Sequence, residues 1–229
     1  MDLLLQTPPL DVYAHMALDE TLVRLRPNAV SLRFYRWTDT PAVTFGYAQS
    51  AAQVRRTLSA HDFTGTYCRR PTGGGLVFHL DDLTFSLIFP SAQKPSAIYE
   101  ELHTLVAHTL GSAAHRVSVH TPAGAYAPAV AGQANACFSN PVQNDLLGTD
   151  GHKILGGAIR RFGQTVLYQG SLQVPCARTD VRYKQAVIEA VRYFTGTKLT
   201  PRAVAADTLA QADTLARTQY RTDAWTEKF

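Results

Sequence analysis

The chain has 229 residues, of which 45% are hydrophobic and 17% charged, so it can bury a core and is not an intrinsically disordered protein. Lys and Arg number 22 against 18 Asp and Glu, and this net charge of +4 comes without a basic stripe, a recognition helix or a zinc-finger spacing. Nucleic-acid binding is therefore not expected, and the length favours one large domain.

The first predicted elements mix helices and strands. Apolar residues at three- and four-residue intervals predict a helix over 13–26, which ends before Pro27. Short β-rich runs predict strands over 30–35 and 42–47, and the segment 51–60 has a helical pattern.

The rest of the chain continues this mixture. Strands are predicted over 66–68 and 84–89, on either side of a glycine-rich loop. Hairpins and helices therefore mix without the regular alternation of a doubly wound sheet, which predicts an α+β fold. The remaining predicted elements are a helix over 97–114, a long irregular loop over 121–140, strands over 153–159 and 165–174, and helices over 186–194 and 203–220.

The glycine-rich loop is the first segment with chemical potential. Two arginines precede three consecutive glycines, and a histidine follows them. The bare backbone lets a ligand approach main-chain N–H groups, and the guanidinium groups are donors for a phosphate or a carboxylate. A flexible hairpin tip is the alternative interpretation. The candidate ligand-binding residues of this segment are Arg69, Arg70, Gly73, Gly74, Gly75 and His79.

A second candidate segment begins at Lys153. Its ammonium can lie near a ligand while Gly156, Gly157 and Ala158 leave room for a slender chain. A lysine on the surface of a hairpin is the alternative.

The third candidate is Cys137, which lies within the predicted irregular loop. A thiolate accepts an acyl group as a thioester when a nearby cation lowers the thiol pKa, and Lys153 is a candidate for that cation. An inert buried thiol is the alternative, and this is the interpretation given to Cys68 and Cys176.

The cysteine count and the N-terminal segment bear on the compartment. Three cysteines without a CxxC pair indicate neither a disulfide framework nor a metal site. No basic segment followed by a long apolar stretch opens the chain, and no apolar run approaches the ~20 residues of a membrane helix. We therefore expect a cytoplasmic protein that does not enter a membrane.

An ordered set of stretches extends over most of the chain: MALDE (16–20), FYRW (34–37), FGY (45–47), RRPTGGG (69–75) with His79, KI (153–154) with Gly156 and Ala158, and QGSL (169–172). This set resembles the lipoate-protein ligases and octanoyl or lipoyl transferases, whose catalytic domain is shared with biotin-protein ligases. The resemblance implies a mixed and antiparallel sheet with flanking helices. It also implies a single catalytic domain of this type over 1–229, without a C-terminal accessory domain.

The resemblance also implies roles for the candidate residues. The glycine loop, His79 and the 156–158 segment would enclose an acyl chain, and Lys153 would hold its carbonyl or phosphate oxygen. The product would be an amide on a lysine of a lipoyl carrier domain, in a 2-oxo acid dehydrogenase E2 or the glycine cleavage H protein. An acyl carrier protein would be the acyl donor of a transferase.

Two branches of the family differ in their chemistry. Octanoyltransferases use a cysteine thioester and no cofactor, and the pattern Cys-Phe-x-x-Pro of one such type is present at 137–141. Ligases activate lipoate with ATP and magnesium as lipoyl-AMP, and the unbroken glycine run together with Asn144 and Asp145 is similar to theirs. We expect a transferase with Cys137 as nucleophile and Lys153 as the electrophilic group. An ATP-dependent lipoate-protein ligase is the first alternative, and a catalytically silent acyl-binding protein is the second.

Overall fold

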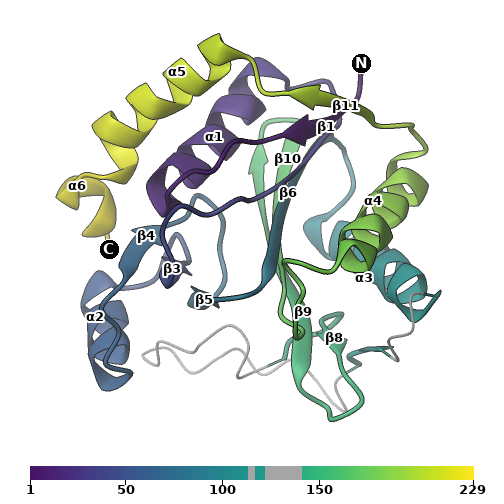
Figure 1. Cartoon of the computed structure of the whole chain (residues 1–229), viewed down its shortest axis with the longest axis horizontal. Coiled ribbons are helices and arrows are strands. Elements are labelled where there is room, and N and C mark those ends of the chain that lie inside the picture. The colour runs from purple at the N-terminus through teal and green to yellow at the C-terminus, as the bar shows by residue number, and fades with distance from the viewer. Residues whose placement is uncertain (113–116, 122–140) are drawn as a thin grey trace.

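The structure is a computed structural model that describes residues 1–112, 117–121 and 141–229. Within these residues, eight strands form a large mixed sheet, and three more form a small sheet beside it (Figure 1). No helix of the described part is both long enough and apolar enough to cross a bilayer.

The large sheet combines a parallel edge with an antiparallel centre. Its strands, in spatial order, are β11 (Thr200–Ala203), β1 (Leu3–Gln6), β2 (Ser31–Phe34), β6 (Leu83–Pro90), β10 (Thr165–Leu172), β9 (Lys153–Phe162), β8 (Leu146–Leu147) and β7 (Ser118–Val119). Strand β1 pairs in parallel with both β11 and β2, whereas every pair from β2 to β7 is antiparallel. The α+β class and the mixed, antiparallel sheet are thus confirmed.

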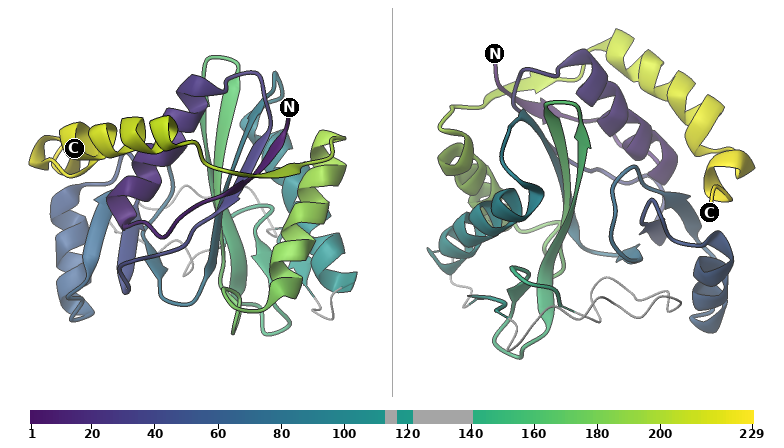
Figure 2. Two further views of the ribbon diagram at one scale, coloured as in Figure 1. Left: turned by 45° about the horizontal axis from the view of Figure 1, so that its top comes forward. Right: turned by 180° about the vertical axis from the view of Figure 1, so that it is seen from behind.

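Helices cover both faces of this sheet (Figure 2). On one face lie α1 (Val12–Leu25) and α5 (Ala206–Leu215), and on the other lie α3 (Pro95–Ser112) and α4 (Val181–Thr195). Asp11 begins α1 by accepting a hydrogen bond from the Ala14 N–H at 2.9 Å, which satisfies an otherwise unpaired donor of the first turn. The other helical segments are α2 (Ala51–Ala60), a π-helical turn over Ala216–Tyr220, and α6 (Asp223–Thr226).

Side-chain alternation gives the two faces of the central strands different characters. Phe85 of β6 and Tyr168 of β10 join the apolar cluster under α3 and α4. Because successive side chains of a strand point to opposite faces, Ser86 and Gln169 face α1, where both hydrogen-bond Asp19. Part of the α1 face is therefore polar, and the candidate site lies there.

The small sheet consists of β4 (Thr66–Arg69), β3 (Ala42–Phe45) and β5 (Val77–His79), with β3 in the middle. Because β4 and β5 pair with opposite edges of β3, the glycine-rich loop between them crosses the end of β3. The sequence pattern placed this loop between strands at 66–68 and 84–89, and it missed β5.

Most predicted elements are confirmed, with small shifts of their ends. The expected helix over 203–220 is shorter, because α5 ends at Leu215 and a π-helical turn follows. Strands β1 and β11 were not predicted, because their pairing joins segments about 200 residues apart in the chain. The irregular loop predicted over 121–140 lies outside the described residues, apart from Thr121.

Candidate functional site

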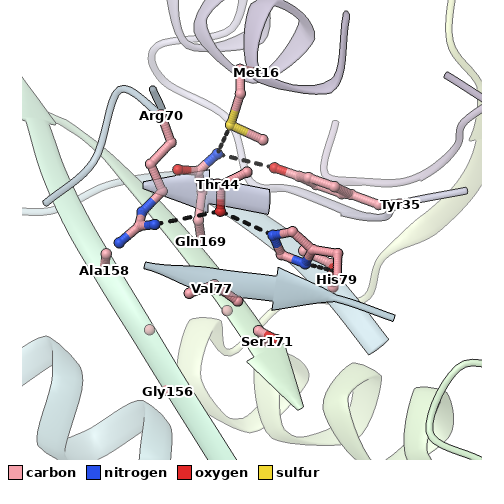
Figure 3. Close-up of a pocket in the computed structure, with 13 residues that line it drawn as sticks. Met16, Tyr35, Thr44, Arg70, Val77, His79, Gly156, Ala158, Gln169 and Ser171 are labelled. Carbon is pink, nitrogen blue, oxygen red and sulfur yellow. Dashed lines mark hydrogen bonds between the residues drawn. The ribbon is translucent and has the colours of Figure 1, made fainter. Parts of the chain in front are cut away.

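A pocket lies between the polar α1 face of the large sheet and the small sheet (Figure 3). The space between its walls amounts to about 400 Å³, including the part that opens to solvent. Among the residues that line it are Gly156, Gly157 and Ala158 of β9, Gln169, Gly170 and Ser171 of β10, Thr44 of β3, Val77 and His79 of β5, and Arg70. The structure thus brings residues 156–158 of the second predicted segment together with Arg70 and His79 of the first. The predicted glycines 73–75 are not among the lining residues.

Glycines let aromatic rings fill the space behind the pocket. A Cβ atom at Gly170 would lie 2.7 Å from the Phe85 ring, and one at Gly157 would overlap the Tyr168 ring. Both rings belong to the core under α3 and α4. These two glycines therefore face the core, where the rings need the space, and only their backbone borders the pocket.

Arg70 fastens the glycine-rich loop from inside the pocket. Its guanidinium donates to the carbonyl oxygens of Gly73, at 2.5 and 3.0 Å, and of Gly75, at 2.7 Å. It also reaches the Thr44 hydroxyl at 3.4 Å. In this structure Arg70 therefore shapes the loop as well as adding positive charge to the pocket wall.

Arg69 points away from the pocket. Its buried guanidinium donates to the carbonyl oxygens of Tyr47 and Gln49, which follow β3, and of Trp225 and Thr226 in α6. Arg69 thus ties the C-terminal helix to the base of the glycine loop. The sequence made it a candidate for ligand binding, but it does not line the pocket that the structure forms.

His79 has a hydrogen-bond partner at each ring nitrogen. Nε2 lies 2.9 Å from the Thr44 hydroxyl, and Nδ1 lies 2.9 Å from Oδ2 of Asp82. Burial raises the pKa of Asp82, but the imidazole and the hydroxyls of Ser171 and Thr84 more than offset this, so the pKa is lowered. Asp82 is therefore a buried carboxylate in its charged form.

Several site residues were not predicted from the sequence. Gln169 accepts from the Thr72 hydroxyl at 2.6 Å and donates to Asp19 at 2.7 Å and to Tyr35 at 3.0 Å. It thereby joins the glycine loop to α1 across the pocket. The polar residues at alternate positions of an otherwise apolar strand, here Gln169 and Ser171, were the available signal.

Lys153 lies at the start of β9, but its ammonium is not in the pocket lining. It forms an ion pair with Asp145 at 2.9 Å, and both side chains are buried. Asp145 also accepts from the Tyr99 hydroxyl at 2.5 Å, whose oxygen accepts from the Gly157 N–H at 3.0 Å. Lys153 is thus connected to the pocket wall through Asp145 and Tyr99.

The three cysteines differ in what the structure says of them. Cys137 lies outside the described residues, so its role stays a prediction. Cys68 is buried, and burial raises the pKa of its thiol well above the ordinary value. Cys176 is exposed. Within residues 1–112, 117–121 and 141–229, no group of three or more His, Cys, Asp or Glu side chains is placed to hold a metal ion.

We expect Gly46→Ala to displace the glycine loop. A Cβ atom at Gly46 would overlap the carbonyl oxygen of Gly74, and this neighbour is backbone that cannot rotate away. Because a displacement of about 1 Å in a site can cost roughly 100-fold in rate, the rate of a reaction in this pocket should fall by about that factor. Gly111→Ala, in α3, meets no atom within 4 Å and should leave the rate unchanged. Equal rates in the two variants would contradict this account.

His103 is a buried histidine behind the pocket. Its Nδ1 lies 2.7 Å from the Asn144 carbonyl oxygen, and its Nε2 lies 2.7 Å from the Tyr168 hydroxyl. Burial lowers the pKa of His103, the hydrogen bond to Asn144 opposes this, and the Lys153 ammonium lowers the pKa further, to about 3. The folded protein therefore holds His103 uncharged.

We expect the free energy of unfolding to fall as the pH drops below about 6.5. The unfolded chain binds a proton at this histidine near pH 6.5, and the folded chain only near pH 3, so acid favours unfolding between these values. Protonation of His103 in the unfolded chain should lower the free energy of unfolding by about 2 kcal/mol between pH 7 and pH 5, and urea denaturation at each pH measures this change. His103→Gln should reduce this pH dependence more than the same substitution at His61, at the exposed end of α2. Identical pH dependence in wild type and His103→Gln would contradict the assignment.

Comparison with known sequences gives one consistent family. Residues 11–201 match the lipoyl protein ligase A/B catalytic domain. The octanoyltransferase LipM of Brevibacillus brevis is 26% identical over 92% of this chain and 93% of its own length. LipM of Symbiobacterium thermophilum is 31% identical over 69% of this chain and 60% of its length, and LipM of Oceanobacillus iheyensis is 29% identical over 73% and 62%. The chain thus spans about 60% of the length of these last two relatives.

Solved structures share the fold. Lipoate-protein ligase A bound with ATP superposes with a TM-score of 0.76 at 21% identity, over 99% of this chain and 98% of that one. The lipoate protein ligase that was studied with its E2 lipoyl domain, from Thermoplasma acidophilum, has a TM-score of 0.73 at 19% identity, over 99% and 95%.

Proposed function

Because the chain belongs to the lipoyl protein ligase A/B catalytic domain family, we propose that it transfers an octanoyl or lipoyl group to a lysine of a lipoyl carrier domain. The observation that carries this proposal is the similarity to the LipM octanoyltransferases, which extends over 92% of the chain for the Brevibacillus protein. The largely small-residue and backbone lining of the pocket on β9 and β10 supports an acyl chain as the ligand. The carrier would be an E2 lipoyl domain or a glycine cleavage H protein.

The chemistry we propose has two steps. The Cys137 thiolate attacks the carbonyl carbon of an octanoyl thioester on an acyl carrier protein, the carrier thiolate leaves, and an acyl-enzyme thioester forms. The amine of the target lysine then attacks this thioester, an amide forms, and the C–S bond to Cys137 breaks. No cofactor is consumed.

Lys153 is proposed as the cation that stabilises the oxyanion of both steps. Its ion pair with Asp145 holds a charged ammonium at the start of the strand whose next residues line the pocket. Contact with the oxyanion requires the side chain to turn from Asp145 toward the bound acyl group. Backbone N–H groups of the glycine loop are further candidate donors.

The alternative is an ATP-dependent ligase that forms lipoyl-AMP with ATP and magnesium. The support for this alternative is that the chain shares its fold with lipoate-protein ligase A, whose structure was solved with bound ATP. In that case Cys137 would be dispensable, and pyrophosphate would be released.

Intact-mass measurement separates these functions. The protein is incubated with octanoyl carrier protein, or with lipoate, ATP and magnesium, each with and without an apo lipoyl domain. The proposal predicts an octanoyl adduct that hydroxylamine removes and that passes to the lipoyl domain without ATP. Lipoyl-domain modification only when ATP is present would establish the ligase, and ligand binding without any product would establish a silent binding protein.

A further inference from the structure

We propose that Thr44, His79 and Asp82 form a proton-accepting chain for the second step, in which the target lysine attacks the acyl group. The chain would take the proton that the lysine ammonium must lose before its nitrogen can attack. This inference rests on the proposed function and adds to it the group that acts as base.

Two hydrogen bonds connect the three side chains in series, and two of the three line the pocket. Thr44 lies on β3 and His79 on β5, which are paired strands, and both residues line the pocket (Figure 3). The Thr44 Oγ1 to His79 Nε2 distance is 2.9 Å, and the His79 Nδ1 to Asp82 Oδ2 distance is also 2.9 Å. A hydroxyl, an imidazole and a carboxylate in this order have the geometry by which proteins move a proton away from a reacting group.

The hydrogen-bond partners fix where the protons lie. Oδ2 of Asp82 accepts from the hydroxyls of Thr84 and Ser171, each at 2.6 Å. A carboxylate has no proton to give, so His79 Nδ1 donates to Asp82, and in the neutral imidazole that the proposal requires, Nε2 carries the lone pair. The Thr44 hydroxyl then donates to Nε2, and its oxygen, which accepts from Arg70 at 3.4 Å, has one further lone pair for a donor in the pocket.

Charged groups around the imidazole set how readily it takes a proton. Asp82, in the connection from β5 to β6, stabilises the imidazolium. Arg70, whose guanidinium lies 3.4 Å from the Thr44 hydroxyl, and His15 of α1, which interacts electrostatically with His79, are nearby groups whose positive charge opposes it. Arg178 lies 3.4 Å from the other oxygen of Asp82. Trp37 stacks on the ring, with centroids 4.6 Å apart, and holds its orientation.

The proton balance of the step is complete. The lysine ammonium gives one proton to Thr44 Oγ1 while Thr44 passes its own to His79 Nε2, and the free amine attacks the thioester carbon. The C–N bond forms and the C–S bond breaks, and the second proton of the attacking nitrogen goes to the departing Cys137 thiolate. His79 afterwards returns its proton to solvent.

The test follows the two steps separately. Acyl-enzyme is formed from octanoyl carrier protein, mixed with apo lipoyl domain, and quenched at intervals for intact-mass measurement. General acid and base groups contribute about 10² to 10⁴ in rate, so His79→Gln and Thr44→Val should slow discharge at pH 7 by at least roughly 100-fold relative to acylation. Thr44→Ser keeps the hydroxyl and should restore discharge. Above pH 7, discharge by His79→Gln should rise about tenfold per pH unit, because solution then supplies the free amine.

A matched histidine control is His61→Gln, at the exposed end of α2, which should behave as wild type. If His79→Gln slows acylation and discharge equally and a higher pH does not restore discharge, His79 only supports the fold and the inference is overturned. Discharge at the wild-type rate would overturn it too. Failure of the wild type to form any acyl-enzyme would instead contradict the proposed function.

Discussion

Replacing Cys137 by serine is expected to abolish octanoyl transfer and the octanoyl adduct. A serine hydroxyl is far less ionised than a thiol at neutral pH, so without a dedicated base it does not attack the carrier thioester. We expect the rate of lipoyl-domain modification to fall by at least roughly 1,000-fold, to the level of the uncatalysed background. The measurement is the intact mass of enzyme and lipoyl domain after incubation with octanoyl carrier protein.

Cys176→Ser is the matched control for this variant. Cys176 is exposed, so reagents can reach its thiol. The hydrogen bond between Cys176 and Asp81 is donated by the Cys176 backbone N–H, so the serine variant keeps it. This variant should keep the adduct and the wild-type rate. Full activity of Cys137→Ser would contradict the thioester mechanism. Loss of the adduct in Cys176→Ser alone would identify Cys176, after β10, as the nucleophile.

Replacing Asp19 by alanine is expected to have the largest effect on stability, about 3–5 kcal/mol. Asp19 of α1 forms an ion pair with Arg33 of β2 at 2.6 Å, and neither side chain reaches solvent. Ser86 and Gln169 donate to the same carboxylate, so its removal leaves a buried charge and further buried donors unpaired. Urea denaturation followed by tryptophan fluorescence measures the loss.

Two controls show whether the buried charge is the cause. Asp213→Ala removes one partner of an exposed ion pair with Arg217 and should cost less than about 1 kcal/mol. The double variant Asp19→Leu with Arg33→Met removes both buried charges and should be more stable than Asp19→Ala. A double variant as unstable as the sum of its two single variants would show that the ion pair is not the source of the effect.

Arg69 and Arg70 show a feature of the site that the sequence alone does not predict. The motif of Arg69 and Arg70 indicated anion binding for both, yet only Arg70 lines the pocket, and Arg69 holds the C-terminal helix. Neighbouring side chains at the end of a strand point in opposite directions, so only one can face a given cavity. Which one does so depends on what packs on each side, and local sequence does not contain that information.

Lys153 shows that the sequence also does not predict the ion-pair partner of a charged side chain. The sequence identified a lysine at the start of a strand beside small residues, and the structure confirms that position. In the structure the Lys153 ammonium pairs with Asp145, and Asp145 accepts from Tyr99 of α3, which precedes Lys153 by 54 residues in the chain. Such a pairing arises only when β8, β9 and α3 are packed together, and it determines the direction of the Lys153 side chain.

The sequence by itself determined the fold class, most helices and strands, and the segments that build the pocket, because these depend on short-range periodicity and on glycine, proline and charged motifs. Only the tertiary structure decided that β10 brings Gln169 to the cavity that His79 lines, and that hydrogen bonds connect Thr44, His79 and Asp82 in series. These contacts join strands that pair across long stretches of chain. The physical reason is that pairing and register are set by the burial of whole sheet faces, which is a property of the assembled core and not of any single segment.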